Sequence, residues 1–523
     1  MQNLPLATST LATLRDNDMI YIDKTPLIAA MTRLPGRYFL SRPRRFGKST
    51  LVDTFKELFE GNQRLFAGLF IHDKWDWSRR FPVIKIDFAD GVIASRAELD
   101  RHISTLLYDN QQRLGVVCDE FHDYIPGCFA DLIRKAKAQY GKKVVILIDE
   151  YDKPILDNIE HPDRAAEVRE GLKNLYSVMK GQDAHIQFIF MTGVTKFSKV
   201  SLFSGLNQLQ DITLDSHYAT ICGYTQNDLE SSFAEHLAGV DWEKLKQWYN
   251  GYNFLGEQVY NPYDILLFIA NQHGYRNYWF ETGTPAFLVK LFRQQNYFLP
   301  ELEQIQVGEE LLNSFEIERI NPITLLFQSG YLTISRVSEQ LARHVYHLAI
   351  PNQEVQQALY DHFIDGYTDQ AAHRLQLQTG LYDALIKADL SQLFITIRRL
   401  FAGVPWRNFT NNDLADDEGY YASVLYAFFS SLNATIIPED ISNRGQVDLT
   451  VQLAGYTYLI EIKVNHTKRP AKQGKPNAAL KQILVKNYAE KYRGSGKGVF
   501  AVGLVFNSQL RQLVQADYQL KDE

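Results

Sequence analysis

Arg-Pro-Arg-Arg-Phe-Gly-Lys-Ser-Thr, at residues 42–50, is the stretch of this 523-residue chain that decides its fold. It follows an apolar run at residues 38–40. A glycine-bearing loop between a strand and a helix turns backbone N–H groups onto phosphate oxygens, and the helix N-terminus adds its dipole. In this arrangement Lys48 reaches the outer phosphates and Ser49 holds Mg²⁺. The stretch therefore predicts a P-loop NTPase domain with a parallel sheet, in which the nucleotide is contacted by Gly47, Lys48, Ser49 and Thr50.

A second motif completes this prediction further along the chain. The apolar run at residues 144–148 ends on Asp149 and Glu150. A carboxylate at the end of a buried strand completes the Mg²⁺ shell, and a second one beside it orients the attacking water. We assign these roles to Asp149 and Glu150. Either motif alone is compatible with a chance tripeptide or an ordinary polar strand end, whereas both in this order favour ATP binding.

The loop departs from its consensus at one position. The first residue is usually Gly, and here it is Arg42. A side chain at that point narrows the turn, so we expect the loop to open differently. Arg44 and Arg45 add positive charge where phosphates are expected to lie, which supports binding but says nothing about hydrolysis.

Composition places the chain among large globular proteins. Hydrophobic residues make up 45% and charged residues 22% of it. Three cysteines, Cys118, Cys128 and Cys222, lack metal-ligand spacing and predict a reducing compartment. The N-terminus has no signal core, and no apolar run is long enough to cross a bilayer. We therefore expect a cytoplasmic protein of roughly two to four domains with no membrane partner.

Charge is unevenly distributed. The net charge of −6 argues weakly against nucleic-acid binding by the whole chain. Residues 463–497 nevertheless contain one acid, Glu490, and ten basic residues: Lys463, Lys468, Arg469, Lys472, Lys475, Lys481, Lys486, Lys491, Arg493 and Lys497. This segment is either a phosphate-binding patch or a solvated surface, and the charge run alone does not decide between them.

A predicted hairpin precedes the basic segment. Residues 447–464 contain two β-rich runs around Ala454 and Gly455. If these two residues form the turn, antiparallel pairing places Asp448 opposite Glu461.

Two carboxylates that face each other across a ladder repel unless a positive group lies between them. The alternation of the strand places Lys463 on the face of Glu461 and turns Ile462 into the core. A divalent metal between Asp448 and Glu461 would relieve the repulsion, and Lys463 could position water or neutralise a developing phosphate charge.

This Asp-x₁₂-Glu-x-Lys pattern resembles the PD-(D/E)XK nuclease superfamily. The resemblance implies that Asp448 and Glu461 are metal ligands and that Lys463 is the catalytic lysine. The proline of the family name is Val447 here, a change that many members tolerate.

Further positions match the superfamily in order along the chain. Glu418 corresponds to a metal-binding carboxylate on the preceding helix, and Gln482 to a glutamine on the following basic helix. An Asn-Arg-Gly turn at residues 443–445 precedes the first strand. The bare Asp and Glu-x-Lys pattern is weak by itself, but the ordered set implies a C-terminal α/β domain of the restriction-endonuclease type.

Other blocks resemble a family of bacterial predicted AAA-type ATPases fused to PD-(D/E)XK domains, in which arginine in place of the first loop glycine is typical. The resemblance implies that Thr192 occupies the sensor position near the γ-phosphate. A strand-terminating turn explains Thr192 equally well. The matching blocks are residues 21–25, 40–49, 147–154, 192–196, 204–207 and 249–254.

We expect three domains: an AAA-like ATPase domain at 1–222, a mainly helical lid or winged-helix-like region at 223–402, and a nuclease-like domain at 403–523. Aromatic clusters near residues 248, 260 and 278 could stack on bases, but core packing is their usual role. The stretch 325–334 predicts a helix, a glycine turn and a strand.

Three functions remain open after the sequence. The first is an ATPase coupled to Mg²⁺- or Mn²⁺-dependent cleavage of DNA, in genome defence or mobile-element processing by analogy with similar fusions. The second is an ATP-dependent switch or scaffold whose C-terminal domain binds nucleic acid or protein without cleaving. The third is an assembly module that holds ATP statically. A homo-oligomer is possible, since AAA-type ATPases commonly use an arginine from a neighbouring subunit.

Overall fold

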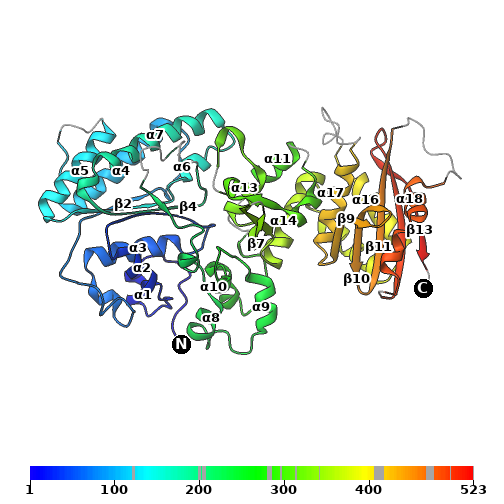
Figure 1. Ribbon diagram of the computed structural model, residues 1–523, viewed down its shortest axis with the longest axis horizontal. Helices are drawn as coiled ribbons and strands as arrows, with labels where there is room; N and C mark the ends of the chain where they lie inside the picture. Colours follow the sequence, from blue (N-terminus) through cyan, green and yellow to red (C-terminus); the bar gives the residue numbers. More distant parts are fainter. Residues whose placement is uncertain are drawn as a thin grey trace. The chain divides into compact units, whose positions relative to one another are not determined.

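The computed structural model describes residues 1–119, 124–197, 202, 208–279, 286–294, 297–312, 315–340, 342–405, 417–466, 476–494 and 496–521 (Figure 1). The chain forms two compact units. The first contains Met1–Trp279 and Gln306–Gln353, and the second contains Phe280–Ile305 and Glu354–Glu523. The predicted middle region, 223–402, is thus divided between the units, and domain boundaries at 222 and 402 remain predictions.

A five-stranded parallel sheet organises the first unit, as the P-loop motif predicts. Its order is β2-β3-β4-β1-β5, so that one strand separates β1 from β3. The strands are β1 Gly36–Ser41, β2 Val83–Asp87, β3 Val144–Asp149, β4 Ile186–Gly193 and β5 Gln210–Asp211. Every residue of β3 is buried, which explains its continuous apolar run. In the register of the sheet Leu40 pairs with Thr192 and Asp87 with Asp149, so the polar strand ends meet at one edge.

Helices cover both faces of this sheet (Figure 1). One face carries α1 Leu11–Asp16, α2 Thr25–Thr32 and α3 Lys48–Glu60, and the other carries α4 Arg96–Leu114, α5 Ile125–Tyr140, α6 Lys153–Leu156 and α7 Pro162–Gly181. Short 3₁₀ turns in this unit are η1 Gln63–Phe66, η2 Asp183–His185, η3 Ser216–Tyr218 and η6 Ile317–Arg319.

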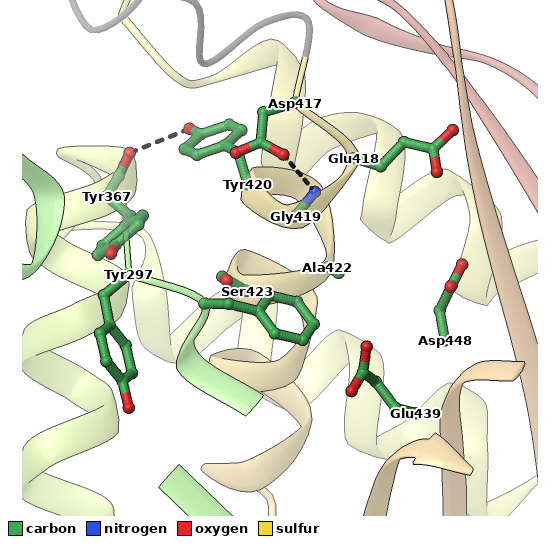
Figure 2. A pocket seen from close by; sticks show the side chains of 11 residues that line it. Tyr297, Tyr367, Asp417, Glu418, Gly419, Tyr420, Ala422, Ser423, Glu439 and Asp448 are labelled. Carbon is green, nitrogen blue, oxygen red and sulfur yellow. Dashed lines mark hydrogen bonds between the residues drawn. The ribbon is translucent and has the colours of Figure 1, made fainter. Parts of the chain in front are cut away.

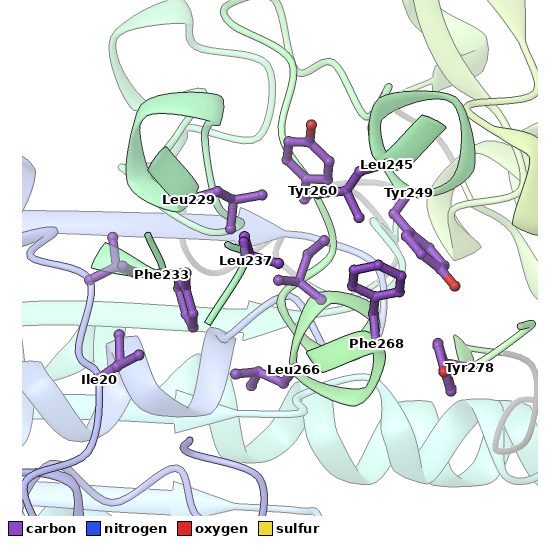
Figure 3. Close-up of a cluster of buried hydrophobic side chains, with 12 residues drawn as sticks. Ile20, Leu229, Phe233, Leu237, Leu245, Tyr249, Tyr260, Leu266, Phe268 and Tyr278 are labelled. Carbon is purple, nitrogen blue, oxygen red and sulfur yellow. The ribbon is translucent and has the colours of Figure 1, made fainter. Parts of the chain in front are cut away.

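The aromatic residues after the sheet build a separate core. Helices α8 Gln226–Ser232, α9 Trp242–Tyr249 and α10 Pro262–Ala270 enclose it (Figure 3). Tyr249 and Tyr260 have no exposed surface, and Tyr278 is 4% exposed. Core packing is therefore confirmed for these three rings, and base stacking is not available to them.

The remaining part of the first unit is a small antiparallel sheet with the order β6-β8-β7. Its elements are β6 Gln306–Gly308, α12 Glu309–Leu312, α13 Pro322–Ser329, β7 Thr333–Gln340 and β8 Arg343–Ala349. Gly330 caps α13 in the left-handed region at φ 92°, which confirms the predicted helix, glycine turn and strand.

A five-stranded mixed sheet organises the second unit, in the order β13-β12-β11-β10-β9. Its strands are β9 Thr435–Ser442, β10 Gly445–Leu453, β11 Tyr456–Asn465, β12 Gly498–Asn507 and β13 Gln512–Lys521. Strands β11 and β12 are parallel, and α18 crosses between them. The helix packs so closely that a Cβ on Gly503 would lie 2.3 Å from the Leu480 nitrogen. The helices and 3₁₀ turns of the second unit are α11 Ala286–Gln294, η5 Leu299–Gln304, α14 Gln353–Thr368, α15 Arg374–Ile386, α16 Leu390–Ala402, α17 Glu418–Ser430, α18 Ala478–Lys486 and η9 Tyr488–Tyr492.

Among the helices that the structure describes, none combines the length and the apolarity needed to span a membrane.

Candidate functional site

The loop at residues 42–50 joins β1 to α3 as predicted. Gly47 is the N-cap of α3 and adopts φ 89°, a left-handed conformation that favours glycine. Lys48 is 4% exposed, and its Nζ donates to the carbonyl oxygens of Arg42 at 3.1 Å and Pro43 at 3.0 Å. The loop therefore encloses its own lysine at the carboxyl edge of the sheet.

Arg42 explains how this loop manages without its first glycine. Its side chain is 1% exposed, and Nη1 donates to the carbonyl oxygens of Ser41 at 2.9 Å and Thr213 at 2.8 Å. Its guanidinium also lies 3.8 Å from the centre of the Phe254 ring. Burial lowers the pKa of Arg42 to about 10. The side chain thus packs into the protein beneath the loop.

A cavity of about 400 Å³ adjoins the loop. Gly47, Lys48, Ser49, Thr50 and Glu150 line one part of it. Its other walls come from segments around residues 5–9, 20–24, 221–224 and 262–266, and of these only 20–24 overlaps a block that carries the family resemblance, residues 21–25.

The two loop arginines differ in their surroundings. Arg45 lines the cavity and stacks on Tyr263, with its guanidinium 3.7 Å from the ring centre. Arg44 is exposed and is absent from the described residues that line the cavity. Phosphate contact by either arginine remains a prediction.

Asp149, at the end of β3, and Ser49, at the start of α3, contact each other through their side chains. Asp149 has no exposed surface, and burial raises its pKa to about 6 although the Ser49 hydroxyl hydrogen bonds to it. Its Oδ2 is buried and has no hydrogen-bond partner among the described residues. A buried carboxylate oxygen without a partner beside a hydroxyl is a donor set that suits Mg²⁺. Thr192 Oγ1, at the end of β4, is likewise buried and without a partner in the described part of the chain.

The hairpin of the second unit has the predicted register. Leu453 pairs with Tyr456, which leaves Ala454 and Gly455 as the two-residue turn. Leu449 pairs with Ile460, so Asp448 and Glu461 follow as the next opposing residues. Asp448 Oδ2 accepts a hydrogen bond of 2.6 Å from the Ile462 backbone N–H.

Lys463 gathers the predicted acidic residues around its ammonium group. Its Nζ lies 3.2 Å from Glu461 Oε1 and 3.4 Å from Glu418 Oε2. Glu418 also accepts a hydrogen bond of 3.2 Å from the Val464 N–H, which fixes the start of α17 against β11. Ile462 has no exposed surface, as the strand alternation predicts.

The electrostatics of this cluster favour a bound cation. Glu461 is 1% exposed, and burial together with the Asp448 charge raises its pKa to about 7. Burial also raises the pKa of Asp448. Burial acts to lower the pKa of Lys463, but the surrounding carboxylates outweigh it and raise that pKa. Glu461 Oε2 is buried and has no hydrogen-bond partner among the described residues.

The cluster is not a ready-made metal centre. Within the part of the chain that the structure describes, no three His, Cys, Asp or Glu side chains are gathered closely enough to hold a metal ion. Glu418 instead pairs with Lys463. The residue types and the unpartnered oxygen of Glu461 fit a divalent cation, and Asp448 and Glu461 would hold it, joined by Glu418 if its pair with Lys463 opens.

A second cavity, of about 370 Å³, opens beside this cluster. In Figure 2 the carboxylates of Glu418, Asp448 and Glu439 lie across the cavity from Tyr297. Its described lining residues are Tyr297, Phe298, Tyr367, Asp417, Glu418, Gly419, Tyr420, Ala422, Ser423, Glu439 and Asp448.

Gln482 lies in α18, as its match to the following helix requires. It hydrogen bonds to Tyr488, whose pKa is raised by burial and also by the charges of Glu461 and Asp448. Tyr488 in turn needs Gly445, because a Cβ there would lie 2.8 Å from its hydroxyl oxygen.

The basic segment is partly neutralised. Lys491 pairs with Asp440, and Arg493 pairs with Glu490 at 3.2 Å. Four of its members, Lys468, Arg469, Lys472 and Lys475, lie outside the described residues. A phosphate-binding role for this segment remains a prediction.

Comparison with known proteins agrees with both predicted domains. Residues 5–203 match the family described as Predicted AAA-ATPase, and residues 416–516 match the PD-(D/E)XK nuclease superfamily. A protein of Azotobacter chroococcum mcd 1, named "Uncharacterized protein in vnfD 5'region", is 45% identical over 514 residues, which cover 98% of this chain and 98% of the relative. The chain belongs to the family of predicted AAA-ATPases with a PD-(D/E)XK nuclease domain. No solved structure matches it.

One block of this predicted AAA-ATPase packs onto the nucleotide loop. The Phe46 ring contacts Tyr252 and Phe254 edge-on, with ring centres 4.8 and 5.9 Å apart. The block at 249–254 therefore supports the loop that carries Lys48. The block at 204–207 lies outside the described residues.

Asp152 is a residue of the ATPase unit whose role sequence reasoning missed. It has no exposed surface and accepts hydrogen bonds from Val194 N at 3.1 Å and Thr195 N at 2.6 Å. Gly193 leaves room for it, since a Cβ there would lie 2.2 Å from Asp152 Oδ1. Asp152 thus ties the loop after β3, which carries Glu150, to the loop after β4.

The nuclease domain also contains cavity residues that the motifs did not reveal. Glu439 comes from β9 and Tyr297 from the segment before η5. Neither residue lies in a recognisable motif. The only sequence feature that could have indicated a role is the position of Glu439 in a strand next to the strand of Asp448.

Proposed function

We propose that this protein hydrolyses ATP at the first site and cleaves DNA with Mg²⁺ or Mn²⁺ at the second. The observation that carries the nuclease part is the convergence of Glu418 and Glu461 on Lys463, with Asp448 in the next pair of the hairpin. Family membership supports the same two activities.

At the ATP site, Lys48 binds the outer phosphates, with the ammonium group leaving the loop carbonyls that it contacts in this structure. Ser49 and Asp149 would hold Mg²⁺, and Glu150 would orient the attacking water from its position in the cavity wall. Thr192 serves as the polar group near the γ-phosphate.

At the nuclease site, a divalent cation, once bound, would supply an activated water and neutralise phosphate charge. Asp448 and Glu461 hold it in place across the hairpin. Lys463 then exchanges its contact with Glu418 for an oxygen of the scissile phosphate, where its charge stabilises the transition state.

A second function is favoured by one observation. Lys463 is ion-paired to Glu418, and no three acidic side chains are assembled for a metal among the described residues. An ATP-dependent switch whose C-terminal domain binds DNA without cutting it would tolerate this arrangement.

The test is cleavage of circular, linear double-stranded and single-stranded DNA with Mg²⁺ or Mn²⁺, with and without ATP. We expect the parent to cleave and the Glu461→Ala variant to lose cleavage. Absence of cleavage by the parent under all these conditions, with ATP hydrolysis retained, would favour the switch.

A further inference from the structure

The cavity beside Lys463 has two chemically different walls. Four carboxylates line it, those of Asp417, Glu418, Glu439 and Asp448. Aromatic rings line it as well, and two of them, Tyr297 and Phe298, keep part of their surface accessible. We infer that the cavity receives one unpaired nucleobase on these two rings, beside the phosphodiester that is cut. The inference rests on the proposed nuclease function and defines its substrate as a single strand.

Accessibility separates these two rings from the other aromatic residues of the cavity. Tyr367 and Tyr420 are 4% and 3% exposed and form part of its buried wall. Tyr297 and Phe298 line the cavity and are only half-buried, so each ring has surface left for contact with a base. Stacking of a base on such a ring is tolerant of sequence because every base has a π-face.

The Tyr297 ring and the backbone next to Phe298 are held in place before any substrate arrives. The Tyr297 ring packs against Phe292, with centres 4.8 Å apart, and its hydroxyl hydrogen bonds to Glu301. The next backbone N–H after Phe298, that of Leu299, donates to Ser423 Oγ at 3.2 Å. Ser423 lies on α17, the helix that begins with Glu418. The backbone that carries the two rings is thus anchored to the helix that carries a predicted catalytic carboxylate, which reduces the entropy lost on binding.

Charge sets the orientation of the bound nucleotide. A phosphate facing four carboxylates is repelled unless a divalent cation lies between them. The phosphodiester therefore faces the carboxylates together with the cation, and the base faces the rings, which carry no charge.

Size argues for a single unpaired base. The cavity of about 370 Å³ falls in the range of roughly 300–1,000 Å³ that is typical for small ligands. A base pair with its two backbones does not fit into it, and enzymes that use such pockets act on single strands or extrude the base.

The test uses the full-length protein and single-stranded DNA that carries one 2-aminopurine, a fluorescent base whose emission falls on stacking. We expect Mg²⁺-dependent quenching with the parent. Tyr297→Ala combined with Phe298→Ala should remove the quenching and weaken binding about 5- to 100-fold. The single variant Tyr297→Phe keeps both aromatic rings and should show the quenching and the DNA affinity of the parent. Tyr382→Ala is the matched control, because Tyr382 is 42% exposed in the same unit and does not line the cavity.

A parallel measurement compares cleavage of single-stranded and fully paired DNA of one sequence. We expect the parent to cut the single strand at least tenfold faster, and the double variant to lose this preference. Quenching that survives in the double variant, or equal cutting of both substrates by the parent, would overturn the inference while the nuclease function stands. If the parent cuts neither substrate, the nuclease function fails, and the quenching experiment alone then decides whether the base site exists.

Discussion

The buried carboxylate of Glu461 is expected to destabilise the second compact unit, Phe280–Ile305 and Glu354–Glu523, which we call the nuclease unit because it contains the PD-(D/E)XK match. Its pKa rises from 4.5 to about 7 because of burial and the nearby Asp448 charge. A carboxyl group with a raised pKa in the folded state binds its proton more tightly there than in the unfolded chain. Stability therefore falls as the pH rises from about 4.5 to about 7 and stays low above that range. Glu461→Gln, which cannot ionise, should remove this loss.

The size of the effect follows from the shift. A change of one pKa unit corresponds to about 1.4 kcal/mol, so the rise of the Glu461 pKa to about 7 limits the loss of folding stability to about 3 kcal/mol. The effective dielectric constant at protein sites is well above that of a dry interior, which weakens the interaction, and we expect about half of the limit or more. The Glu461→Gln variant should thus be about 1.5–3 kcal/mol more stable than the parent at pH 8, and less than half as much at pH 5.

Amide hydrogen exchange of β11, followed by mass spectrometry, measures this difference within the nuclease unit itself. At pH 8 the protection of β11 should increase about 10- to 150-fold in the variant, since 1.4 kcal/mol is a factor of ten. Saturating Mg²⁺ should reduce the gap, because a cation stabilises the ionised parent. Glu490→Gln, at an exposed ion pair, is the control and should change protection little.

A variant that is no more protected than the parent at pH 8, or a gap that grows towards pH 5, would refute the reasoning about Glu461.

The other predictions concern both sites. Lys48→Ala should abolish binding of a fluorescent ATP analogue, because Lys48 is the loop cation that is expected to contact the outer phosphates; binding at parental affinity would contradict its role. Asp448→Asn should abolish DNA cleavage and leave ATP hydrolysis intact, as measured in paired assays. Asp152→Asn should lower stability by about 1–3 kcal/mol in thermal unfolding and slow ATP hydrolysis, since it replaces one of the two carboxylate oxygens that accept from Val194 N with an NH₂ donor. DNA affinity should fall steeply with salt if the basic segment at 463–497 binds phosphates, and a flat salt response would exclude it.

Local rules predicted the parts of the fold that carry the motifs. The two β-rich runs around Ala454 and Gly455 define a register, because a slip by one residue would turn Ile462 to solvent and Lys463 into the core. The apolar run of β3 likewise indicates a strand that is buried on both faces. These patterns place Asp149, Asp448 and Glu461 at strand positions without knowledge of the tertiary structure.

Contacts between distant segments could not be predicted in the same way. The burial of Arg42 depends on Thr213 and Phe254, which lie more than a hundred residues further along the chain. The assignment of residues 280–305 to the nuclease unit has no local signal, and it brings Tyr297 to the cavity that Glu418 and Asp448 line. In the sequence Asp152 looks like any polar residue that follows a strand. Its role becomes visible only from its hydrogen bonds to the loop after β4.

The most direct test of the central claim is single-turnover cleavage of single-stranded DNA with Mg²⁺ and ATP by the parent and by Lys463→Ala, with ATP hydrolysis measured in the same samples. We predict that the variant loses at least about 100-fold in cleavage rate, as expected for removal of a group that stabilises transition-state charge, and hydrolyses ATP at the parental rate. Cleavage by Lys463→Ala at the parental rate would contradict the assignment of this cluster as the nuclease site.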